Sequence, residues 1–248
     1  MKSMDIDIMA SVRDVSCDRI KGRNVVVIDV LRATSTIVTA LANKASCVIP
    51  VEHIEEAWEY HTNETENETV LGGERDAIII EGFHFGNSPL SYIEEAIRGK
   101  HVVLTTTNGT RAIKACQKGK ALYIASFLNV SAVVRQLIQE GEDVTIVCSG
   151  TNGEYSMDDS LCAGMIISLI NEALSITTTD LGWTVKELYD AYRGNIHGAL
   201  KNCSHYKRLN KNGFKDDVEY CLQTDIYDII PVYKDGYINL IKEKEDDF

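Results

Sequence analysis

Short apolar runs alternate with amphipathic segments along most of the chain. The apolar runs are rich in β-branched residues, which is typical of buried strands, and they occupy residues 24–30, 46–51, 69–80, 101–104, 120–129 and 143–150. The segments between them have the apolar spacing or the start signals of helices, and they occupy residues 31–45, 53–61, 85–100, 110–116, 130–141 and 158–174. Strands that alternate with helices predict a three-layer α/β/α sandwich around a mostly parallel sheet.

The last part of the chain has a different pattern. Residues 184–220 are mostly amphipathic helix by their spacing, and residues 228–241 have the pattern of a β-hairpin that turns at Asp235-Gly236. Such a hairpin is expected to add antiparallel strands, so the predicted sheet is mixed. The chain has three prolines and no Gly/Ser-rich spacer, so residues 1–248 are predicted to form a single domain. Its repeated strand–loop–helix units leave an internal duplication open.

Composition narrows the classes of partner. With 25 Lys and Arg against 37 Asp and Glu, the formal net charge is −12, which disfavours binding to nucleic acid or to an anionic membrane. No apolar run is long enough for a spanning helix, and the N-terminus lacks a signal-peptide pattern, so a cytoplasmic location is expected. The seven cysteines form no CxxC pair and are predicted to be reduced thiols. A homodimer is the default expectation for an enzyme of this size.

Three of the predicted strands end in loops of similar composition, at residues 28–36, 104–112 and 148–159. Each loop offers small hydroxyl side chains just before a predicted helix, where free N–H groups and the helix dipole favour an anion. Because ligands bind beyond the carboxyl ends of parallel strands, the loops are expected to form one site. Serine and threonine also cap helices, and for any single loop that interpretation stays open. The candidate binding residues are Thr105, Thr106, Thr107, Asn108, Gly109, Thr110, Ser149, Gly150 and Thr151.

Charged residues occur in or beside the same loops. Arg32, Arg75 and Arg111 are predicted to form a shared anion site, because guanidinium groups at one sheet edge can bind phosphate. Asp29 follows four apolar strand residues, so its carboxylate is expected to be nearly buried and to need a partner. Carboxylates together with substrate phosphate usually hold Mg²⁺. The candidate metal ligands are Asp29, Glu74, Asp158 and Asp159, although one of the last two equally fits an ordinary first-turn residue of a helix.

Other mechanisms fail on spacing. The chain has neither GxxxxGK[ST] nor GxGxxG after its first predicted strand, which disfavours nucleotide binding and a nicotinamide-dependent oxidoreductase. A thiol phosphatase would need arginine six residues after Cys148, where Glu154 stands, and Leu31 breaks the Asp-x-Asp motif of haloacid-dehalogenase phosphatases. Cys203 and His205 are interpreted as a core cysteine and a surface or capping histidine.

Several motifs, taken in order, resemble the 2-phosphosulfolactate phosphatase family: VIDVLRATSTIVTAL, LGGER, GFHFGNSP, LTTTNGTRA, ASFLN and CSGTNGEYSMDDSLCAG. Any one of them alone is weak, but together they are specific. The resemblance implies a Mg²⁺-dependent phosphatase that hydrolyses the phosphate ester of 2-phosphosulfolactate, or of a similar phosphorylated acid, to sulfolactate and phosphate. It also implies a place in coenzyme M biosynthesis and an α/β fold distinct from the common phosphatase folds, that is, one that differs from the haloacid-dehalogenase and Rossmann folds.

The resemblance and the loops together suggest roles for individual residues. Asp29, Arg32, Asn108 and Arg111 are assigned to catalysis, and Arg75 and Asn87 join the remaining loop residues in substrate binding. Whether Asp29 holds the metal or attacks phosphorus to form a phosphoaspartate stays open. The alternative function is a non-catalytic protein that binds a small sulfonate or phosphate anion in the same pocket.

Overall fold

The computed structural model describes residues 3–63 and 68–241. Within them, one eleven-stranded sheet has the order β5-β4-β6-β3-β11-β10-β7-β2-β8-β1-β9. Parallel pairs join β1 (Met4–Met9), β2 (Asn24–Ile28), β3 (Cys47–Pro50), β4 (Thr69–Arg75), β6 (His101–Thr105), β7 (Ala121–Ala125), β8 (Val144–Cys148) and β9 (Ile176–Thr178). Antiparallel pairs add β5 (Ile78–Ile79), β10 (Pro231–Lys234) and β11 (Tyr237–Leu240). The predicted mixed, mostly parallel sheet is confirmed.

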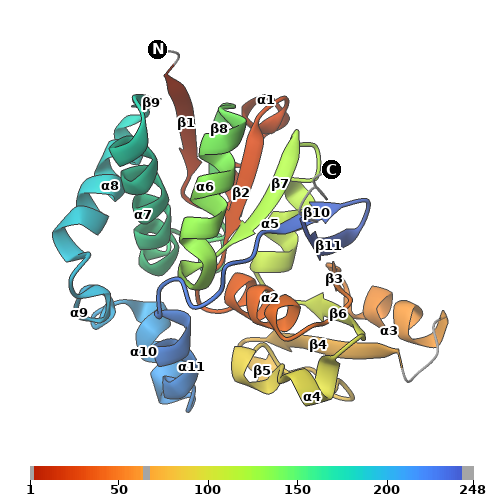
Figure 1. Cartoon of the computed structure of the whole chain (residues 1–248). Helices are drawn as coiled ribbons and strands as arrows, with labels where there is room; N and C mark the ends of the chain where they lie inside the picture. The colour runs from red at the N-terminus through yellow and green to blue at the C-terminus, as the bar shows by residue number, and fades with distance from the viewer. Residues whose placement is uncertain (1–2, 64–67, 242–248) are drawn as a thin grey trace.

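Helices cover both faces of this sheet (Figure 1). They are α1 (Cys17–Ile20), α2 (Ala33–Ala42), α3 (Ile54–Asn63), α4 (Glu94–Ile97), α5 (Gly109–Ala115), α6 (Val130–Glu140), α7 (Met157–Ala173), α8 (Asp180–Tyr192), α9 (Ile196–Leu200), α10 (Ser204–Lys211) and α11 (Lys215–Cys221). Short 3₁₀ helices are η1 (Val12–Asp14), η2 (Pro89–Ser91) and η3 (Phe127–Asn129). The three-layer α/β/α prediction is therefore confirmed, while the contrast with the haloacid-dehalogenase and Rossmann folds stays a prediction.

Strand β2 shows how the layers arise. Its side chains alternate between the two faces of the sheet, as the pleat requires. Val26 and Ile28 belong to the core that α6, α7 and α8 cover, whereas Val25 and Val27 belong to the core beneath α1, α2 and α5. All four side chains are fully buried. A strand that is covered on both faces has a continuous apolar run, which is why the sequence pattern identified it.

The C-terminal hairpin lies in the middle of the sheet. Strand β10 pairs with β7 on one side, and β11 pairs with β3 on the other through Ile238 and Val48. The predicted hairpin is confirmed, and it connects two groups of parallel strands, β4-β6-β3 and β7-β2-β8-β1-β9. The residues of the candidate site come from both groups.

Other predicted elements need correction or refinement. Strand β1 is not among the predicted strands, although its apolar residues Met4, Ile6 and Ile8 alternate with aspartates and are buried. Residues 85–100 form η2 and the short α4 rather than one helix. The Ser88 hydroxyl does not cap η2, because it donates to Asp217 at 2.7 Å. The predicted helical region 184–220 is divided among α8 to α11.

Candidate active site

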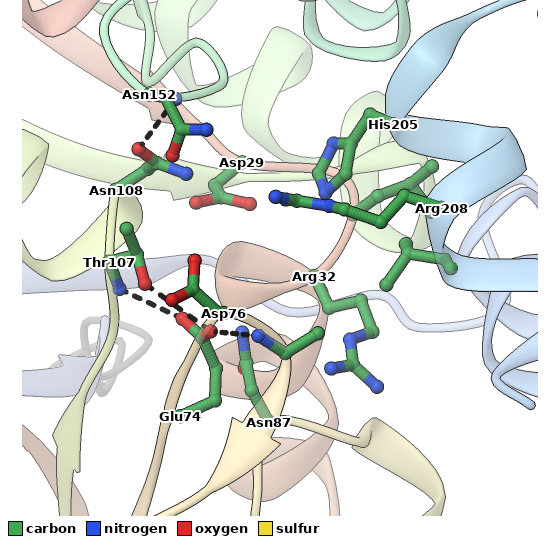
Figure 2. A pocket seen from close by; sticks show the side chains of 13 residues that line it. Asp29, Arg32, Glu74, Asp76, Asn87, Thr107, Asn108, Asn152, His205 and Arg208 are labelled. Carbon is green, nitrogen blue, oxygen red and sulfur yellow. Dashed lines mark hydrogen bonds between the residues drawn. The ribbon is translucent and has the colours of Figure 1, made fainter. Parts of the chain in front are cut away.

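The loops that follow β2, β4, β6 and β8 meet at one pocket, which α10 borders on the opposite side (Figure 2). Asp29, Asp76, Thr107 and Asn152 reach it from the four loops, and Glu74 reaches it from the end of β4 itself. This meeting of strand ends is the arrangement that the sequence predicts, because parallel strands present their carboxyl ends at one edge. The part that α10 contributes was not predicted.

Asp29 is the most deeply placed carboxylate that lines the pocket. Its residue is 6% exposed, and its Oδ1 accepts a hydrogen bond from the Ala33 N–H at 3.2 Å. Burial raises the pKa of Asp29 to about 6, against the opposing effects of nearby His205 and the Ala33 N–H. Gly109 allows the loop after β6 to approach, because a Cβ there would lie 2.6 Å from Asp29 Oδ2. The predicted burial of Asp29 is confirmed.

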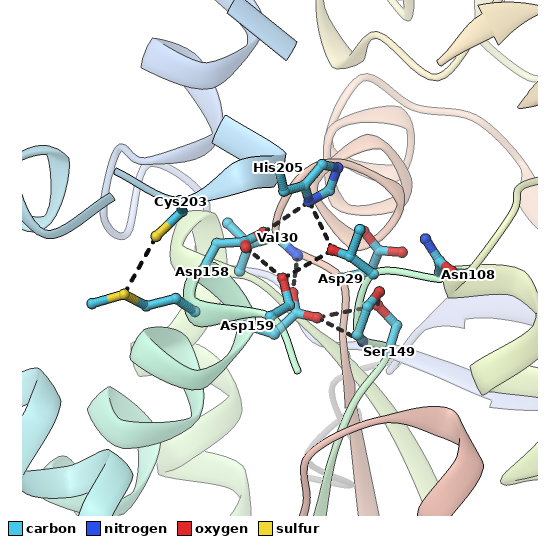
Figure 3. A network of polar contacts seen from close by, with 12 residues as sticks. Asp29, Val30, Asn108, Ser149, Asp158, Asp159, Cys203 and His205 are labelled. Atoms are coloured by element: carbon cyan, nitrogen blue, oxygen red, sulfur yellow. Dashed lines mark hydrogen bonds and ion pairs between the residues drawn. The ribbon is translucent and has the colours of Figure 1, made fainter. Parts of the chain in front are cut away.

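Asp159 holds two of the loops together from inside the protein (Figure 3). Its Oδ1 accepts from the Val30 N–H at 2.9 Å, and its Oδ2 accepts from the Gly150 N–H at 3.0 Å and the Ser149 hydroxyl at 3.2 Å. Burial raises the pKa of Asp159 well above its usual value, and the charges of Asp158 and Asp29 add to the rise. The hydrogen bonds tie the loop after β2 to the loop after β8.

Glu74, in the group of strands β4-β6-β3, also joins two segments by accepting backbone hydrogen bonds. Its Oε1 accepts from the Thr107 N–H at 2.8 Å, and its Oε2 accepts from the Ala77 N–H at 2.7 Å and the Thr107 hydroxyl at 3.3 Å. These bonds tie the β4–β5 turn to the loop after β6. Buried backbone donors need such acceptors, so Glu74 and Asp159 both shape the pocket wall.

Asp158 pairs with His205 of α10. The His205 Nδ1 lies 3.7 Å from Asp158 Oδ2 and 3.2 Å from the Thr151 hydroxyl, and the Ser156 hydroxyl donates to Asp158 Oδ1 at 2.5 Å. Burial alone would raise the pKa of Asp158, but the contacts with His205 and Ser156 prevail and hold it below its usual value. The sequence interpretation of His205 as a surface or capping residue is wrong, since it is partly buried and lines the pocket.

The three predicted arginines are divided between two pockets. Arg32 lines the pocket of Asp29, which is the main pocket, but its residue is only 3% exposed. Its guanidinium forms an ion pair with Asp217 and stacks 3.9 Å from the centre of the Phe214 ring. Arg75 and Arg111 line a neighbouring pocket, and Thr107 is common to both. The structure therefore does not bring the three guanidinium groups around one anion position.

The hydroxyls of the β6 loop have different surroundings. Thr106 and Thr110 are buried, and each backbone N–H donates to the hydroxyl of the other at 3.0 Å, as in a helix cap. The Thr105 hydroxyl accepts from Arg75 at 3.0 Å. Thr107 and Asn108 remain on the main pocket, where Asn108 Oδ1 accepts from the Asn152 N–H at 3.1 Å.

Two of the described side chains that line the pocket each have a buried polar atom without a hydrogen-bond partner. Among the described residues, nothing donates a hydrogen bond to Asn87 Oδ1 or accepts one from Arg208 Nε. Both residues line the pocket, and Asn87 was among the predicted binding residues. Arg208 was not, because nothing in the sequence around α10 relates it to loops that are distant in the chain. Its spacing of three from His205 predicts a shared helix face, but not what that face contacts.

The predicted magnesium ligands fit only in part. Among the described residues, no three His, Cys, Asp or Glu side chains form a group that could hold a metal. The oxygens of Glu74 and Asp159 already accept backbone N–H bonds. Asp29 and Asp76, however, line the same pocket. Mg²⁺ is commonly bound by one or two carboxylates plus water and substrate phosphate, so two carboxylates on one pocket are compatible with that kind of site.

A separate property concerns membranes: in the part of the chain that the structure describes, no helix has the length and apolar character needed to cross a bilayer.

Comparison with known proteins gives consistent results. The model of a family described as 2-phosphosulpholactate phosphatase matches residues 10–236. A protein of Clostridium tetani named probable 2-phosphosulfolactate phosphatase is 44% identical over 235 residues, covering 95% of this chain and 100% of that protein. Proteins with the same name from Clostridium botulinum (Eklund 17B) and Clostridium acetobutylicum are each 42% identical, over 231 and 236 residues. These alignments cover 93% and 95% of this chain, and 97% and 100% of the relatives.

Proposed function

Because the chain belongs to the 2-phosphosulfolactate phosphatase family, as its motifs predicted, we propose that the pocket around Asp29 hydrolyses 2-phosphosulfolactate to sulfolactate and phosphate. The protein is a phosphoric monoester hydrolase. The observation that carries the assignment to this pocket is Asp29, a buried carboxylate that faces polar groups from several strand ends. The place of this reaction in coenzyme M biosynthesis stays a prediction, as does the cytoplasmic location.

The substrate carries a phosphate, a carboxylate and a sulfonate, and the phosphate alone contributes about −1.5 to −2 near neutral pH. The pocket offers the side chains of Asn87, Asn108 and Thr107 as polar contacts. Since the pKa of Asp29 is about 6, its ionised form prevails at neutral pH. Both roles left open by the sequence, metal ligand and nucleophile, need that ionised form.

Magnesium is part of the proposal. When bound, Mg²⁺ would neutralise charge on the phosphoryl oxygens. Asp29 and Asp76 would hold it, whereas Glu74 and Asp159 keep the loops in place through their backbone hydrogen bonds. Of the four magnesium ligands that the sequence suggested, the proposal keeps Asp29, and it adds Asp76.

Release of inorganic phosphate tests the function. Purified protein is given 2-phosphosulfolactate, 2-phospholactate and 3-phosphoglycerate, each with Mg²⁺ and with EDTA. We expect the fastest release from 2-phosphosulfolactate, loss of release in EDTA and recovery when Mg²⁺ is restored. Release that is insensitive to EDTA would remove magnesium from the proposal. Binding of these esters without release from any of them would instead support the non-catalytic alternative.

A further inference from the structure

Among the described residues that line the main pocket, one arginine has no counter-charge. The arginine and histidine side chains that line this pocket are Arg32, His205 and Arg208. Arg32 is neutralised by Asp217, and His205 contacts Asp158 at 3.7 Å. Arg208 makes no side-chain hydrogen bond or ion pair with any described residue, and its Nε is buried without an acceptor. A buried donor that lacks an acceptor is costly, so a ligand that supplies one would be favoured.

Helix α10 holds Arg208 in place. Leu209 is 1% exposed and belongs to the core, so it anchors the helix. His205 contacts the loop after β8 through Thr151, at 3.2 Å. Residues three apart lie on the same helix face, so the anchored His205 sets the side on which Arg208 projects. In Figure 2 the Arg208 side chain extends from α10 toward Asp29.

We infer that Arg208 binds the phosphoryl group of the substrate, opposite Asp29. This inference rests on the proposed phosphatase function of the same pocket. A guanidinium group presents five N–H donors in a planar fork that matches the oxygens of phosphate, and here its Nε has no competing acceptor. Donors directed at the transferring phosphoryl group stabilise the charge that it carries in the transition state. Arg208 is thus a catalytic residue that the loop motifs did not include.

The position of the other arginines supports the choice. Arg111 lies in the first turn of α5 and is exposed, and together with Arg75 it lines the neighbouring pocket rather than the one that contains Asp29. Arg75 already donates to the Glu74 carbonyl at 2.8 Å and the Thr105 hydroxyl at 3.0 Å. Of these side chains, Arg208 alone is both unpaired and directed at the pocket of Asp29.

Binding of inorganic phosphate, the reaction product, tests the inference without relying on turnover. Isothermal titration calorimetry with Mg²⁺ present compares wild-type protein with Arg208→Ala, Arg208→Lys and the control Lys207→Ala, which removes a charge from the exposed side of the same helix. We expect Arg208→Ala to weaken phosphate binding about 10- to 100-fold. Arg208→Lys should recover part of the affinity, because lysine keeps the charge but not the fork. Lys207→Ala should match wild type.

Kinetics with 2-phosphosulfolactate separate the proposed phosphatase function from the proposed role of Arg208. Arg208→Ala should lower kcat/KM by about 10²- to 10³-fold, with most of the loss in kcat. If wild-type protein does not hydrolyse the ester but its phosphate binding depends on Arg208, the proposed substrate is wrong and the present inference stands. The inference about Arg208 would be overturned if Arg208→Ala left the phosphate affinity unchanged, or if wild-type protein showed no saturable phosphate binding. It would also be overturned if Arg111→Ala, and not Arg208→Ala, lost phosphate affinity. Arg208→Gln replaces Arg208→Ala if the latter does not fold by circular dichroism.

Discussion

Asp29 is buried deeply enough to lose hydration, yet it lines the pocket in which we propose that phosphate is released. The usual pKa of an aspartate is 3.8, and that of Asp29 in the folded protein is about 6. The folded state therefore binds the proton more tightly than the unfolded state. The stabilising contribution of Asp29 to the free energy of unfolding is therefore lost as the pH rises from below 3.8 to above about 6.

Replacing Asp29 by asparagine should therefore separate activity from stability. The side chain keeps an oxygen for the Ala33 N–H but cannot ionise. We expect phosphate release to fall by about 10²- to 10⁴-fold. In EDTA, the variant should become more stable than wild type by about 1–3 kcal/mol as the pH passes through 6, with little difference below pH 4. Thermal unfolding across this pH range measures the difference, and retained activity would show that Asp29 has been misassigned.

Asp159, a candidate metal ligand from the sequence, accepts backbone hydrogen bonds from two loops, and we propose that its role is structural. In Asp159→Ala, the N–H groups of Val30 and Gly150 lose their acceptors, so we expect a loss of about 2–4 kcal/mol in the free energy of unfolding. Asp159→Asn keeps one acceptor and should lose less. Urea titration gives these values. A large rise in the Mg²⁺ concentration needed for activity of Asp159→Asn, without loss of stability, would instead support the original metal assignment.

At the scale of elements, the close approach of α5 to the loop after β2 places Asp29. Glycine is required at position 109, because a Cβ there would lie 2.4 Å from the Ala33 Cβ and 2.6 Å from Asp29 Oδ2. Neither neighbour is the end of a long flexible side chain, so the backbone would have to move. Gly109 at the start of α5 therefore lets the two segments pack closely, a role that the Asn-Gly sequence alone does not indicate.

Gly109→Ala tests this packing. We expect a loss of about 1–3 kcal/mol from overpacking, and a fall in kcat of about 10-fold or more because Asp29 is displaced. Gly194→Ala is the matched control, since its new Cβ meets nothing within 4 Å. Urea unfolding and steady-state kinetics are measured on both variants. Equal behaviour of the two would show that the loop after β2 tolerates the extra methyl group.

At the scale of the whole molecule, the hairpin β10–β11 connects the strands that position Asp29 with those that position Glu74 and Thr107. Ile238 of β11 is fully buried and pairs with Val48 of β3. The main pocket therefore depends on a segment close to the C-terminus of the chain, which is far in sequence from the family motifs.

Ile238→Ala should destabilise the protein by about 2–4 kcal/mol, because it removes a buried side chain and leaves a cavity. Leu240→Ala, on the same strand but 38% exposed in wild type, should cost less. If residues 1–248 form a single domain, as predicted, calorimetry of wild type and of both variants will show one transition. Two transitions, with only one shifted by Ile238→Ala, would mean that the two groups of strands unfold separately.

Local patterns predicted much of the fold because buried strands and amphipathic helices carry their signals within a few residues. The run before Asp29, the helix at residues 158–174 and the turn at Asp235-Gly236 are examples. The single helix predicted at residues 85–100 was wrong, since this segment forms η2 and α4, and the Ser88 hydroxyl before η2 bonds to distant Asp217 instead of capping the helix. Strand β1 also has a local signal, because its apolar residues alternate with aspartates along the sequence.

The sequence by itself determined the α/β class, the family and the loops at the carboxyl ends of the strands, because each depends on residue order and short-range spacing. Only the tertiary structure decided which charges are free within those loops. It paired Arg32 with Asp217, engaged Asp159 with backbone N–H groups and brought Arg208 to the pocket that Asp29 lines, across 179 positions of the chain. Such contacts depend on packing between distant elements, and the composition of a loop does not show whether a charge meets its counter-charge elsewhere in the fold.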